Sequence, residues 1–493
     1  MNKQILIEKY FDGSNFVESN IQSFDNFIQH GLADVITENK EVEPAIIPHN
    51  IDSFKIRFGK ISVGKPTVIE ADGSKRPIFP AEARLRKLSY SAPIFLEVNS
   101  YINDIQRESF VAEVGKLPIM VRSSNCNLNG MNRDELVKHG EDPTDPGGYF
   151  IINGTEKVLV TIEDLATNNF LCEDLGNGSV VGSLFSAAGS YKIPHQFEMK
   201  KDGFFYMSFS RMKSVPVIVV LKALGMLRDE DIMKAVSDEM YDEILLNLLE
   251  YTDLKTQEDS LDFLARKSNM VQNKEIRVER AREIVDKFLL PHIGMDRSTR
   301  KEKAANICKM LKRFIQVSRG QRAADDKDHY MNKRWRLSGD LLLELFRSNF
   351  KILTGDIIYN FQRIIKRGKL PSVKVIIRDS LLTSRLYSAM ATGNWVGGRQ
   401  GVAQRLDRIN FLSMISHLQK VNSPLSSSQE NFEARALHCT HIGRLCPIET
   451  PEGTNIGLRR NMALMCRTSQ NIDSKLLREQ LVQMGVKEWV MYI

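Results

Sequence analysis

Alternating apolar and polar residues mark the first part of the chain. The runs 54–58 and 66–70 alternate in this way and predict β-strands, because successive side chains of a strand point to opposite faces. Further along, the runs 149–152 and 157–160 flank Asn-Gly at 153–154, which is a strong local signal for a β-hairpin. This part of the chain is therefore expected to be rich in short strands.

Residues 184–335 show a different pattern and are interpreted as a separate α+β domain. The segment begins with an aromatic, strand-prone run at 204–209. After it, apolar residues recur at the spacing of a helix. The helices predicted in this way lie at 229–249, 260–265, 276–289 and 301–316.

Helical spacing continues in the C-terminal third. One helix is expected to begin at Ser338 or Asp340 and to reach residue 350, and another is expected at 354–367, each with a capping side chain at its start. Apolar residues of 401–421 again recur every three or four positions and predict a further helix. Residues 435–466 fit neither period, and irregular polar segments of this kind often carry function.

The composition is that of an ordinary globular chain, with 42% hydrophobic and 26% charged residues among 493. No run approaches the ~20 apolar residues that a membrane span needs, and the first residues lack the apolar core of a signal peptide. The six cysteines are scattered and include no Cys-x-x-Cys pair, which argues against a disulfide scaffold. We therefore expect a cytoplasmic protein that does not enter a membrane.

Positive charge is concentrated in one part of the chain. The net charge is +7, but residues 301–470 alone contain 29 Lys and Arg against 13 Asp and Glu. An excess of positive charge of this kind is expected of a segment that binds a phosphate backbone. A solvated surface rich in charged residues would explain the same excess equally well.

Three ordered sequence blocks carry a family resemblance. The first is Asp145-Pro-Gly-Gly-Tyr-Phe-Ile-Ile-Asn-Gly-Thr-Glu-Lys-Val-Leu159, and the second is Asp325-Asp-Lys-Asp-His-Tyr-Met-Asn-Lys-Arg-Trp-Arg-Leu-Ser-Gly-Asp340. The third begins at Ala391-Thr-Gly-Asn-Trp395 and ends with His438-Cys-Thr-His-Ile-Gly-Arg-Leu-Cys-Pro-Ile-Glu-Thr-Pro-Glu-Gly-Thr-Asn-Ile-Gly-Leu458. With weaker matches at 79–86 and 115–122, these blocks resemble the second-largest subunit of cellular RNA polymerases, in particular the archaeal and eukaryotic type.

The resemblance implies both a length and an architecture. The family's full subunit is more than twice as long, so the chain is expected to be its N-terminal half. Two explanations for the shorter length remain: a subunit that is naturally split into two polypeptides, as in some archaea, or a shortened chain. The implied fold is α+β and multidomain, with a lobe domain inserted into a protrusion domain and a fork region after them. The expected ranges are 1–183 and 336–390 for the protrusion, 184–335 for the lobe, 391–470 for the fork region, and 471–493 for the start of the next region or a C-terminal tail.

Catalysis is expected to depend on other chains. Polymerases transfer nucleotides with two metal ions held by clustered carboxylates. In the family this cluster belongs to the largest subunit, and the isolated Phe-Asp-Gly at 11–13 is no equivalent. The resemblance thus implies a subunit of DNA-directed RNA polymerase, a nucleotidyltransferase, that is not catalytic alone and holds no cofactor, with Mg²⁺ and Zn²⁺ elsewhere in the complex. The implied partners are the C-terminal half of the second-largest subunit, the largest subunit, the small assembly subunits, the DNA template and the RNA–DNA hybrid.

The resemblance places nucleic-acid contacts in two loops of the fork region. The segment 395–399 resembles the first fork loop, beside the upstream part of the hybrid, and 422–435 resembles the second, near the downstream edge of the transcription bubble. A spacing of four predicts that Gln404 and Arg408 share one helix face, although Arg408 could pair with an acidic residue instead. The expected nucleic-acid-binding residues are Arg399, Gln404, Arg408, Lys420, Asn422 and Arg435.

The segment 438–458 resembles the wall of the main cleft, where Arg444 and Glu449 are expected to hold the loop. The residues implied at this wall of the active centre are His438, Arg444, Glu449, Pro451, Glu452 and Asn455. Zinc binding is disfavoured, because the spacing of the nearby histidines and cysteines fits no common zinc site. These candidate ligands are His438, Cys439, His441 and Cys446. The acidic and basic cluster at 325–336 is interpreted as a salt-bridged domain junction rather than a metal site.

Two other functions fit parts of the sequence. A stand-alone nucleic-acid-binding protein would account for the basic segment and predicts salt-dependent binding by the isolated chain. A metal hydrolase would use the His and Cys cluster. The ordered succession of blocks over hundreds of residues favours the polymerase subunit over both.

Overall fold

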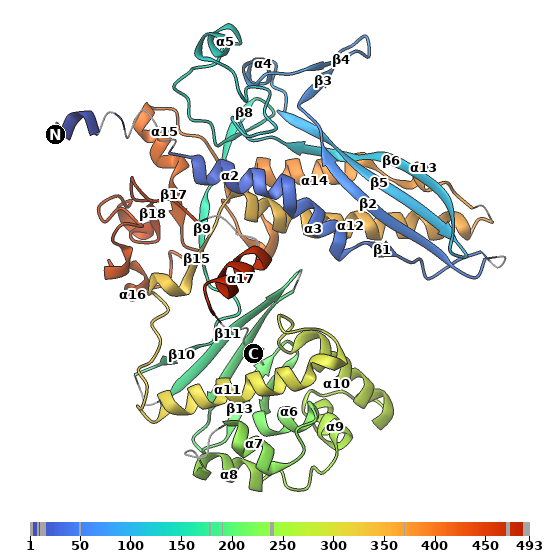
Figure 1. The fold of residues 1–493 in the computed structure, drawn as a ribbon, viewed down its shortest axis with the longest axis vertical. Helices are drawn as coiled ribbons and strands as arrows, with labels where there is room; N and C mark the ends of the chain where they lie inside the picture. The colour runs from blue at the N-terminus through green and yellow to red at the C-terminus, as the bar shows by residue number, and fades with distance from the viewer. Residues whose placement is uncertain are drawn as a thin grey trace. The chain divides into compact units, whose positions relative to one another are not determined.

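The chain folds into two compact units (Figure 1). Unit 1 comprises residues 1–164 and 335–471, and unit 2 comprises 165–334 and 472–493. Both units combine helices with sheets, which confirms the expected α+β class. The computed structural model describes residues 3–6, 9, 16–48, 51–176, 179–189, 191–236, 241–368, 370–469 and 474–486.

An antiparallel sheet with the strand order β1-β2-β5-β6 forms the extended part of unit 1. Its strands are β1 (Glu41–Val42), β2 (Phe54–Val63), β5 (Ser91–Ile102) and β6 (Ile105–Pro118). The first half of β2 buries every second side chain, as its alternating sequence predicts. Asn103 and Asp104 connect β5 to β6 with φ angles of 49° and 61°, the left-handed backbone that a tight hairpin requires.

Long helices cover this sheet and complete the core of unit 1 (Figure 1). They are α2 (Glu18–Asn26), the π-helical turn Phe27–Gly31, α3 (Leu32–Glu38), α12 (Ser338–Ile365), α13 (Val373–Ile376) and α14 (Asp379–Thr392). Aromatic pairs join sheet and helix: Phe54 stacks on Phe361 with ring centroids 4.3 Å apart, and Phe58 meets Phe350 edge-on at 5.5 Å. The prediction of two helices within 338–367 is wrong, because α12 runs through both.

Two small sheets bring distant segments of unit 1 together. One has the order β16-β8-β7 and the other β15-β9-β17-β18. Their strands are β7 (Phe150–Ile152), β8 (Thr155–Leu159), β9 (Thr161–Leu165), β15 (Lys333–Arg336), β16 (Ala403–Arg405), β17 (Lys420–Asn422) and β18 (Arg459–Asn461). The Asn-Gly hairpin predicted at 153–154 is confirmed, with φ angles of 49° and 75°. The remaining elements are β3 (Thr67–Ile69), β4 (Lys75–Pro77), α4 (Pro80–Leu85), α5 (Arg133–Lys138), α15 (Phe411–Leu418) and α16 (Phe432–Arg435).

The single helix predicted over 401–421 is wrong. The segment instead forms β16, a loop, α15 and β17. The carbonyl oxygen of Val402 accepts a hydrogen bond from the Val160 amide, and the Leu406 amide donates to Glu156. Pairing with β8 therefore satisfies the backbone that a helix would have satisfied internally, and the tertiary contact overrides the local pattern.

Unit 2 is a five-stranded antiparallel meander followed by helices. The strands pair in chain order and are β10 (Leu171–Asp174), β11 (Val180–Ala188), β12 (Tyr191–Met199), β13 (Phe205–Phe209) and β14 (Met212–Pro216). The helices are α6 (Val217–Ala223), α7 (Asp229–Val236), α8 (Tyr241–Leu249), α9 (Gln257–Lys267), α10 (Lys274–Phe288), α11 (Arg300–Ser318) and, after residue 472, α17 (Ser474–Gln483). The helices predicted at 260–265, 276–289 and 301–316 are confirmed; the segment predicted at 229–249 contains α7 and α8, and residues 237–240 lie outside the described residues. Within the described ranges, no helix has the length and apolar character to cross a membrane.

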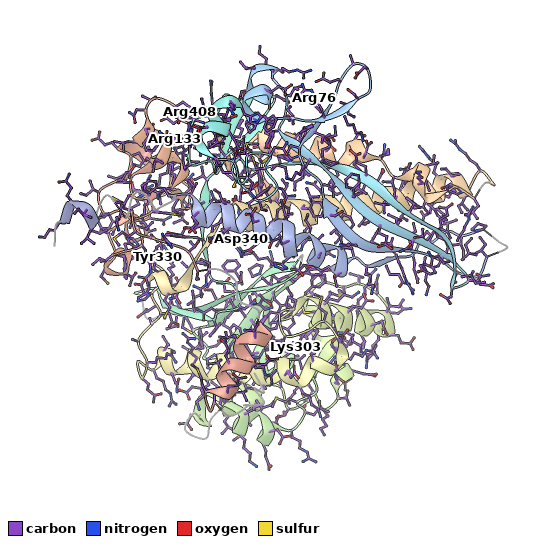
Figure 2. All side chains as sticks on the ribbon, turned by 45° about the horizontal axis from the view of Figure 1, so that its top comes forward. Arg76, Arg133, Lys303, Tyr330, Asp340 and Arg408 are labelled. Atoms are coloured by element: carbon purple, nitrogen blue, oxygen red, sulfur yellow. The ribbon has the colours of Figure 1, made fainter. Side chains whose placement is uncertain are left out.

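Two buried nitrogen groups make the stability of unit 2 depend on pH. Burial lowers the pKa of His195 to about 4, and its Nε2 accepts a hydrogen bond from the Leu290 amide over 3.1 Å. Burial also lowers the pKa of Lys303, labelled in Figure 2, to about 8, although its Nζ donates to the Asp286 carbonyl oxygen over 2.6 Å. Both groups therefore bind protons less readily in the folded chain than in the unfolded chain.

We expect the unfolding free energy of unit 2 to decrease on acidification, because His195 binds a proton less readily in the folded chain than in the unfolded chain. The folded pKa lies below the unfolded one, so stability is present above about pH 6.5 and falls as the pH drops toward 4, by about 3 kcal/mol. Urea denaturation, followed by hydrogen exchange of the β12 amides, measures this slope. In a His195→Gln variant the slope should become shallower than in the parent chain. Identical slopes between pH 6.5 and 4 would contradict the assignment, since carboxylates titrate equally in both chains.

Candidate nucleic-acid interface

Three of the predicted nucleic-acid contacts meet at one hollow in unit 1. Gln404 on β16, Arg408 in the following loop and Lys420 on β17 all line a hollow of about 860 Å³. The helix-face argument for Gln404 and Arg408 is wrong, because neither lies on a helix. The hollow is lined by residues of 154–156, 404–409 and 413–420, together with Arg84. The pairing of β16 with β8 places these segments side by side.

Arg408, labelled in Figure 2, is held by two carboxylates of unit 1. Its Nε lies 2.7 Å from Glu156 and its Nη2 lies 2.9 Å from Asp145, while the guanidinium covers the Tyr149 ring with 5.0 Å to the centroid. Arg84 binds Glu156 from its own side at 2.7 Å. Burial raises the pKa of Glu156, but the two guanidinium groups outweigh it and hold that pKa below the usual value. The alternative interpretation of Arg408, pairing with an acidic residue, is what the structure shows.

Arg399 also directs its guanidinium into the protein. Its Nη2 lies 2.6 Å from Asp164 and its Nη1 lies 2.9 Å from Glu344. The Trp395 indole donates to the Leu341 carbonyl oxygen, so both ends of the 395–399 loop are fixed. The two glycines at 397–398 have φ angles of 77° and 73°, and a Cβ on either would meet no atom within 4 Å among the described residues. The loop thus offers open backbone rather than the Arg399 side chain.

Arg435 stabilises the loop that follows β17. Its guanidinium donates hydrogen bonds to four carbonyl oxygens, on residues 427, 429, 454 and 456. Gly457 lies directly beneath it with φ 70°, and a Cβ there would come within 2.7 Å of the Arg435 Cα. Asn422 lies on β17 opposite Arg459, and its Oδ1 is buried without a hydrogen-bond partner in the described part of the chain.

The residues predicted at the wall of the active centre lie in a largely exposed segment that hydrogen bonds hold in place. The Arg444 guanidinium donates to the Thr440 carbonyl oxygen over 2.9 Å, and Glu449 accepts a hydrogen bond from the Ser416 hydroxyl of α15. His438 contacts the Thr440 hydroxyl through Nδ1 at 2.6 Å. Pro451 and Asn455 are half-buried, and Glu452 is exposed. These contacts fix the side chains of Arg444 and Glu449, and the place of the segment at the wall of the active centre stays a prediction.

Neither candidate metal cluster has the geometry of a metal site. Within the described ranges, no group of three or more His, Cys, Asp or Glu side chains could hold an ion. In the His and Cys segment, the two imidazole centroids of His438 and His441 are 5.9 Å apart and His441 is buried. The cluster at 325–336 is occupied by ion pairs, including Asp325 with Arg313 at 2.7 Å and Asp328 with Lys333 at 3.0 Å.

The sequence interpretation missed Arg405. This residue ends β16, is exposed and lines the hollow, and neither it nor Lys420 has a side-chain ion pair among the described residues. These two side chains are therefore the cations of the hollow that remain available to a phosphate. The available signal was its position in the sequence, directly after Gln404 and three residues before Arg408, within a segment already expected to contact nucleic acid.

Comparison with known proteins covers nearly all of the chain. Residues 15–384 match the family model described as RNA polymerase beta subunit, and residues 404–468 match RNA polymerase Rpb2, domain 3. The chain is 42% identical to DNA-directed RNA polymerase subunit Rpo2 of Saccharolobus solfataricus over 98% of its own length and 43% of that relative. It is 41% identical to subunit Rpo2N of Methanocaldococcus jannaschii over 98% of both chains, and 40% identical to Rpo2N of Halobacterium salinarum over 99% and 96%. The chain thus spans less than half of the Rpo2 relative and nearly all of the Rpo2N relatives.

Proposed function

We propose, because the chain belongs to the RNA polymerase beta subunit family, that it is the N-terminal part of the second-largest subunit of an archaeal DNA-directed RNA polymerase. The observation that carries the proposal is the match to Rpo2N, at 41% identity over 98% of both chains. A stand-alone nucleic-acid-binding protein is disfavoured, because the matched relatives are named as polymerase subunits.

In this proposal the chain shapes the cleft that holds DNA and the RNA–DNA hybrid. It works in the cytoplasm with the C-terminal half of the second-largest subunit, the largest subunit and the small assembly subunits. In this proposal the carboxylates that bind the catalytic metal ions belong to another chain. The expected ranges are 1–183 with 336–390 for the protrusion, 184–335 for the lobe and 391–470 for the fork region. The compact unit that corresponds to the lobe begins earlier, at residue 165, because β10 and β11 belong to its sheet.

The basic residues in and near the hollow have two different roles. Arg399, Arg408 and Arg435 direct their guanidinium groups at protein oxygens and hold the loops in place. Lys420 and Arg405 keep their charges toward the hollow and contact phosphates of the hybrid. Gln404 is positioned by His417, whose Nε2 lies 3.1 Å from its Oε1. Asn422, at the end of β17, contacts nucleic acid, and the wall residues between β17 and β18 approach the active centre.

The test is reconstitution of RNA synthesis on a primed scaffold. The chain is mixed with the complementary half-subunit, the largest subunit and the small subunits, and RNA extension is compared with and without it. We expect extension only when this chain is present, and none from this chain alone. Extension of equal rate without it, or synthesis by the chain alone, would contradict the proposal.

Removal of the two available charges should weaken scaffold retention. We expect the double variant Arg405→Gln and Lys420→Gln to release the scaffold at lower salt than the parent, with the slope of log affinity against log salt reduced by about 0.7–0.9 for each lost phosphate contact. The matched control is Lys351→Gln on α12, an exposed lysine that does not line the hollow. An unchanged salt slope in the double variant would remove Arg405 and Lys420 from the interface.

A further inference from the structure

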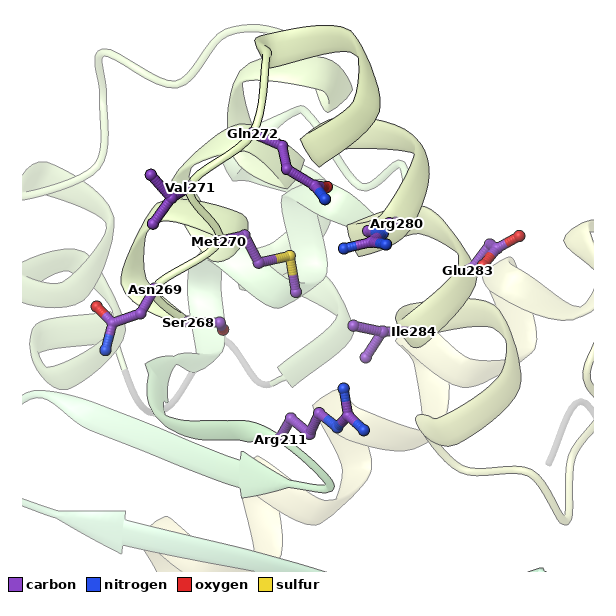
Figure 3. Close-up of a pocket in the computed structure, with 9 residues that line it drawn as sticks. All are labelled: Arg211, Ser268, Asn269, Met270, Val271, Gln272, Arg280, Glu283 and Ile284. Carbon is purple, nitrogen blue, oxygen red and sulfur yellow. The ribbon is translucent and has the colours of Figure 1, made fainter.

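A second hollow, which the proposed function does not use, lies within unit 2. It has a volume of about 710 Å³ and is formed by the β13–β14 turn, the loop between α9 and α10, and α10 itself (Figure 3). All of these segments belong to unit 2, so the hollow depends on the fold of that unit alone. Its lining combines charged, polar and apolar side chains, and each kind restricts what can bind there.

Two guanidinium groups are directed into this hollow (Figure 3). Arg211 comes from the β13–β14 turn and Arg280 from α10. Neither forms an ion pair within the described residues, whereas Arg277 on the same helix binds Asp262 at 2.7 Å. The Glu283 carboxylate at the rim points outward (Figure 3). The interior therefore carries positive charge that no carboxylate of the described residues pairs with, which favours an anionic ligand.

Two polar atoms beside these charges are also without partners. The Ser268 hydroxyl oxygen and the Gln272 Oε1 are buried and have no hydrogen-bond partner among the described residues. A buried polar group left without a partner costs about 1–3 kcal/mol, so a ligand that satisfies both is favoured. A hydroxyl can donate to a carboxylate, whereas Oε1 needs a donor such as a backbone N–H. A peptide supplies both groups, while a phosphate backbone supplies acceptors only.

The remaining lining is apolar. Met270 and Ile284 face the interior (Figure 3), and Val271 at the rim is 95% exposed. Methionine adapts its shape to varied apolar partners. The surrounding residues 165–334 contain 28 Lys and Arg against 25 Asp and Glu, so the unit lacks the excess of positive charge that tracks a nucleic-acid backbone.

We propose that this hollow binds an acidic peptide segment of a protein partner, in which an Asp or Glu side chain is followed or preceded by an apolar one. The carboxylate lies between Arg211 and Arg280, and the apolar neighbour packs on Met270 and Ile284. The backbone N–H of the peptide meets Gln272. The proposal goes beyond the polymerase assignment, because it needs only the folded unit 2 within the full chain.

The test is a selection of peptides by the full-length chain. A phage-displayed library of random peptides is bound to the chain and eluted, and enriched sequences are synthesised with a fluorescent label for anisotropy measurements. We expect enrichment of Asp or Glu beside an apolar residue, and an affinity that falls about tenfold or more in the charge-reversed double variant Arg211→Glu and Arg280→Glu. The control is Lys301→Glu with Lys312→Glu, two exposed lysines of α11 outside the hollow, which should bind within about twofold of the parent.

The proposal is overturned by any of three results. These are the absence of enrichment, enrichment of basic or uncharged sequences, and equal binding by the parent and the charge-reversed variant. Displacement of the bound peptide by a single-stranded oligonucleotide in an Arg280-dependent way would assign the hollow to nucleic acid instead. Unchanged hydrogen exchange of α9 and α10 verifies that the double variant is folded, and Ser268→Ala provides a second, milder variant that should weaken binding. Polymerase reconstitution remains a separate readout.

Discussion

A Gly339→Ala variant should be strongly destabilised, although alanine is the better helix former. Gly339 lies in the first turn of α12, where that helix crosses α2. A Cβ at this position would lie 2.5 Å from the carbonyl carbon of Ser23 and closer still to its oxygen. The two helices are also joined by hydrogen bonds from the Ser338 amide to Asn20 and from the Gly339 amide to Ser23, so neither can shift freely. We expect unit 1 to lose about 3 kcal/mol of unfolding free energy.

The same helix provides the control. At Gly355, a Cβ would meet no atom within 4 Å among the described residues. Gly355→Ala should therefore stabilise the helix by about 0.5–1 kcal/mol through propensity alone. Urea unfolding of unit 1 can be followed by the fluorescence of Trp335 and Trp395 in a Trp489→Phe background. Equal and small effects at 339 and 355 would show that α2 and α12 do not meet as closely as described.

Local sequence patterns predicted most of the fold because, in most elements, one and the same local structure pairs the backbone hydrogen-bonding groups and buries the apolar face. The strand at 54–58 and the helices of unit 2 are of this kind. The segment 338–367 predicts two helices because Thr354 resembles a helix cap. Inside α12 the Thr354 hydroxyl instead donates to the Lys351 carbonyl oxygen, and buried side chains on either side carry the helix through.

The helix predicted for the segment 401–421 is wrong for a different reason. Its apolar residues have helical spacing, but Ile409 and Leu412 are 83% and 77% exposed, so the spacing does not mark a buried helix face. Val402 and Leu406 are buried by pairing with β8, about 245 residues earlier in the chain. Only the tertiary fold contains that information.

The candidate site shows the same limit for charge. The sequence predicts nucleic-acid contacts for several basic residues of 391–470, but it does not tell which of them are already neutralised by carboxylates. The carboxylate partners of Arg399 and Arg408 lie 235 and 263 positions away, at Asp164 and Asp145. Arg405 was overlooked while Arg399 and Arg408 were preferred, because free and paired arginines look alike in a sequence. Whether an arginine is neutralised depends on which carboxylates the fold places beside it.

Removal of the Arg408 guanidinium should destabilise unit 1 through the carboxylates that it leaves behind. Glu156 and Asp145 have side chains only 15% and 11% exposed, and both lie beside the Tyr149 ring. Because Arg408 is itself 39% exposed, solvent screens part of its contribution, and we expect Arg408→Ala to cost about 2 kcal/mol. The measurement is the urea midpoint of unit 1, with hydrogen exchange of β7 and β8 as the local readout.

A double-mutant cycle separates the ion pair from general loss of packing. If Arg408 acts by neutralising Glu156, then Glu156→Gln should remove part of the penalty of Arg408→Ala, leaving a coupling of about 1 kcal/mol. The pair should also weaken on acidification: the Glu156 pKa is held below its usual value, so its contribution is present above about pH 4.5 and falls as the pH drops toward the folded pKa. The control is Arg86→Ala, whose carboxylate partners Glu70 and Glu82 lie on the surface and whose loss should change stability little. Strict additivity of the two substitutions would mean that Arg408 stabilises unit 1 through Asp145 or the Tyr149 ring rather than through Glu156.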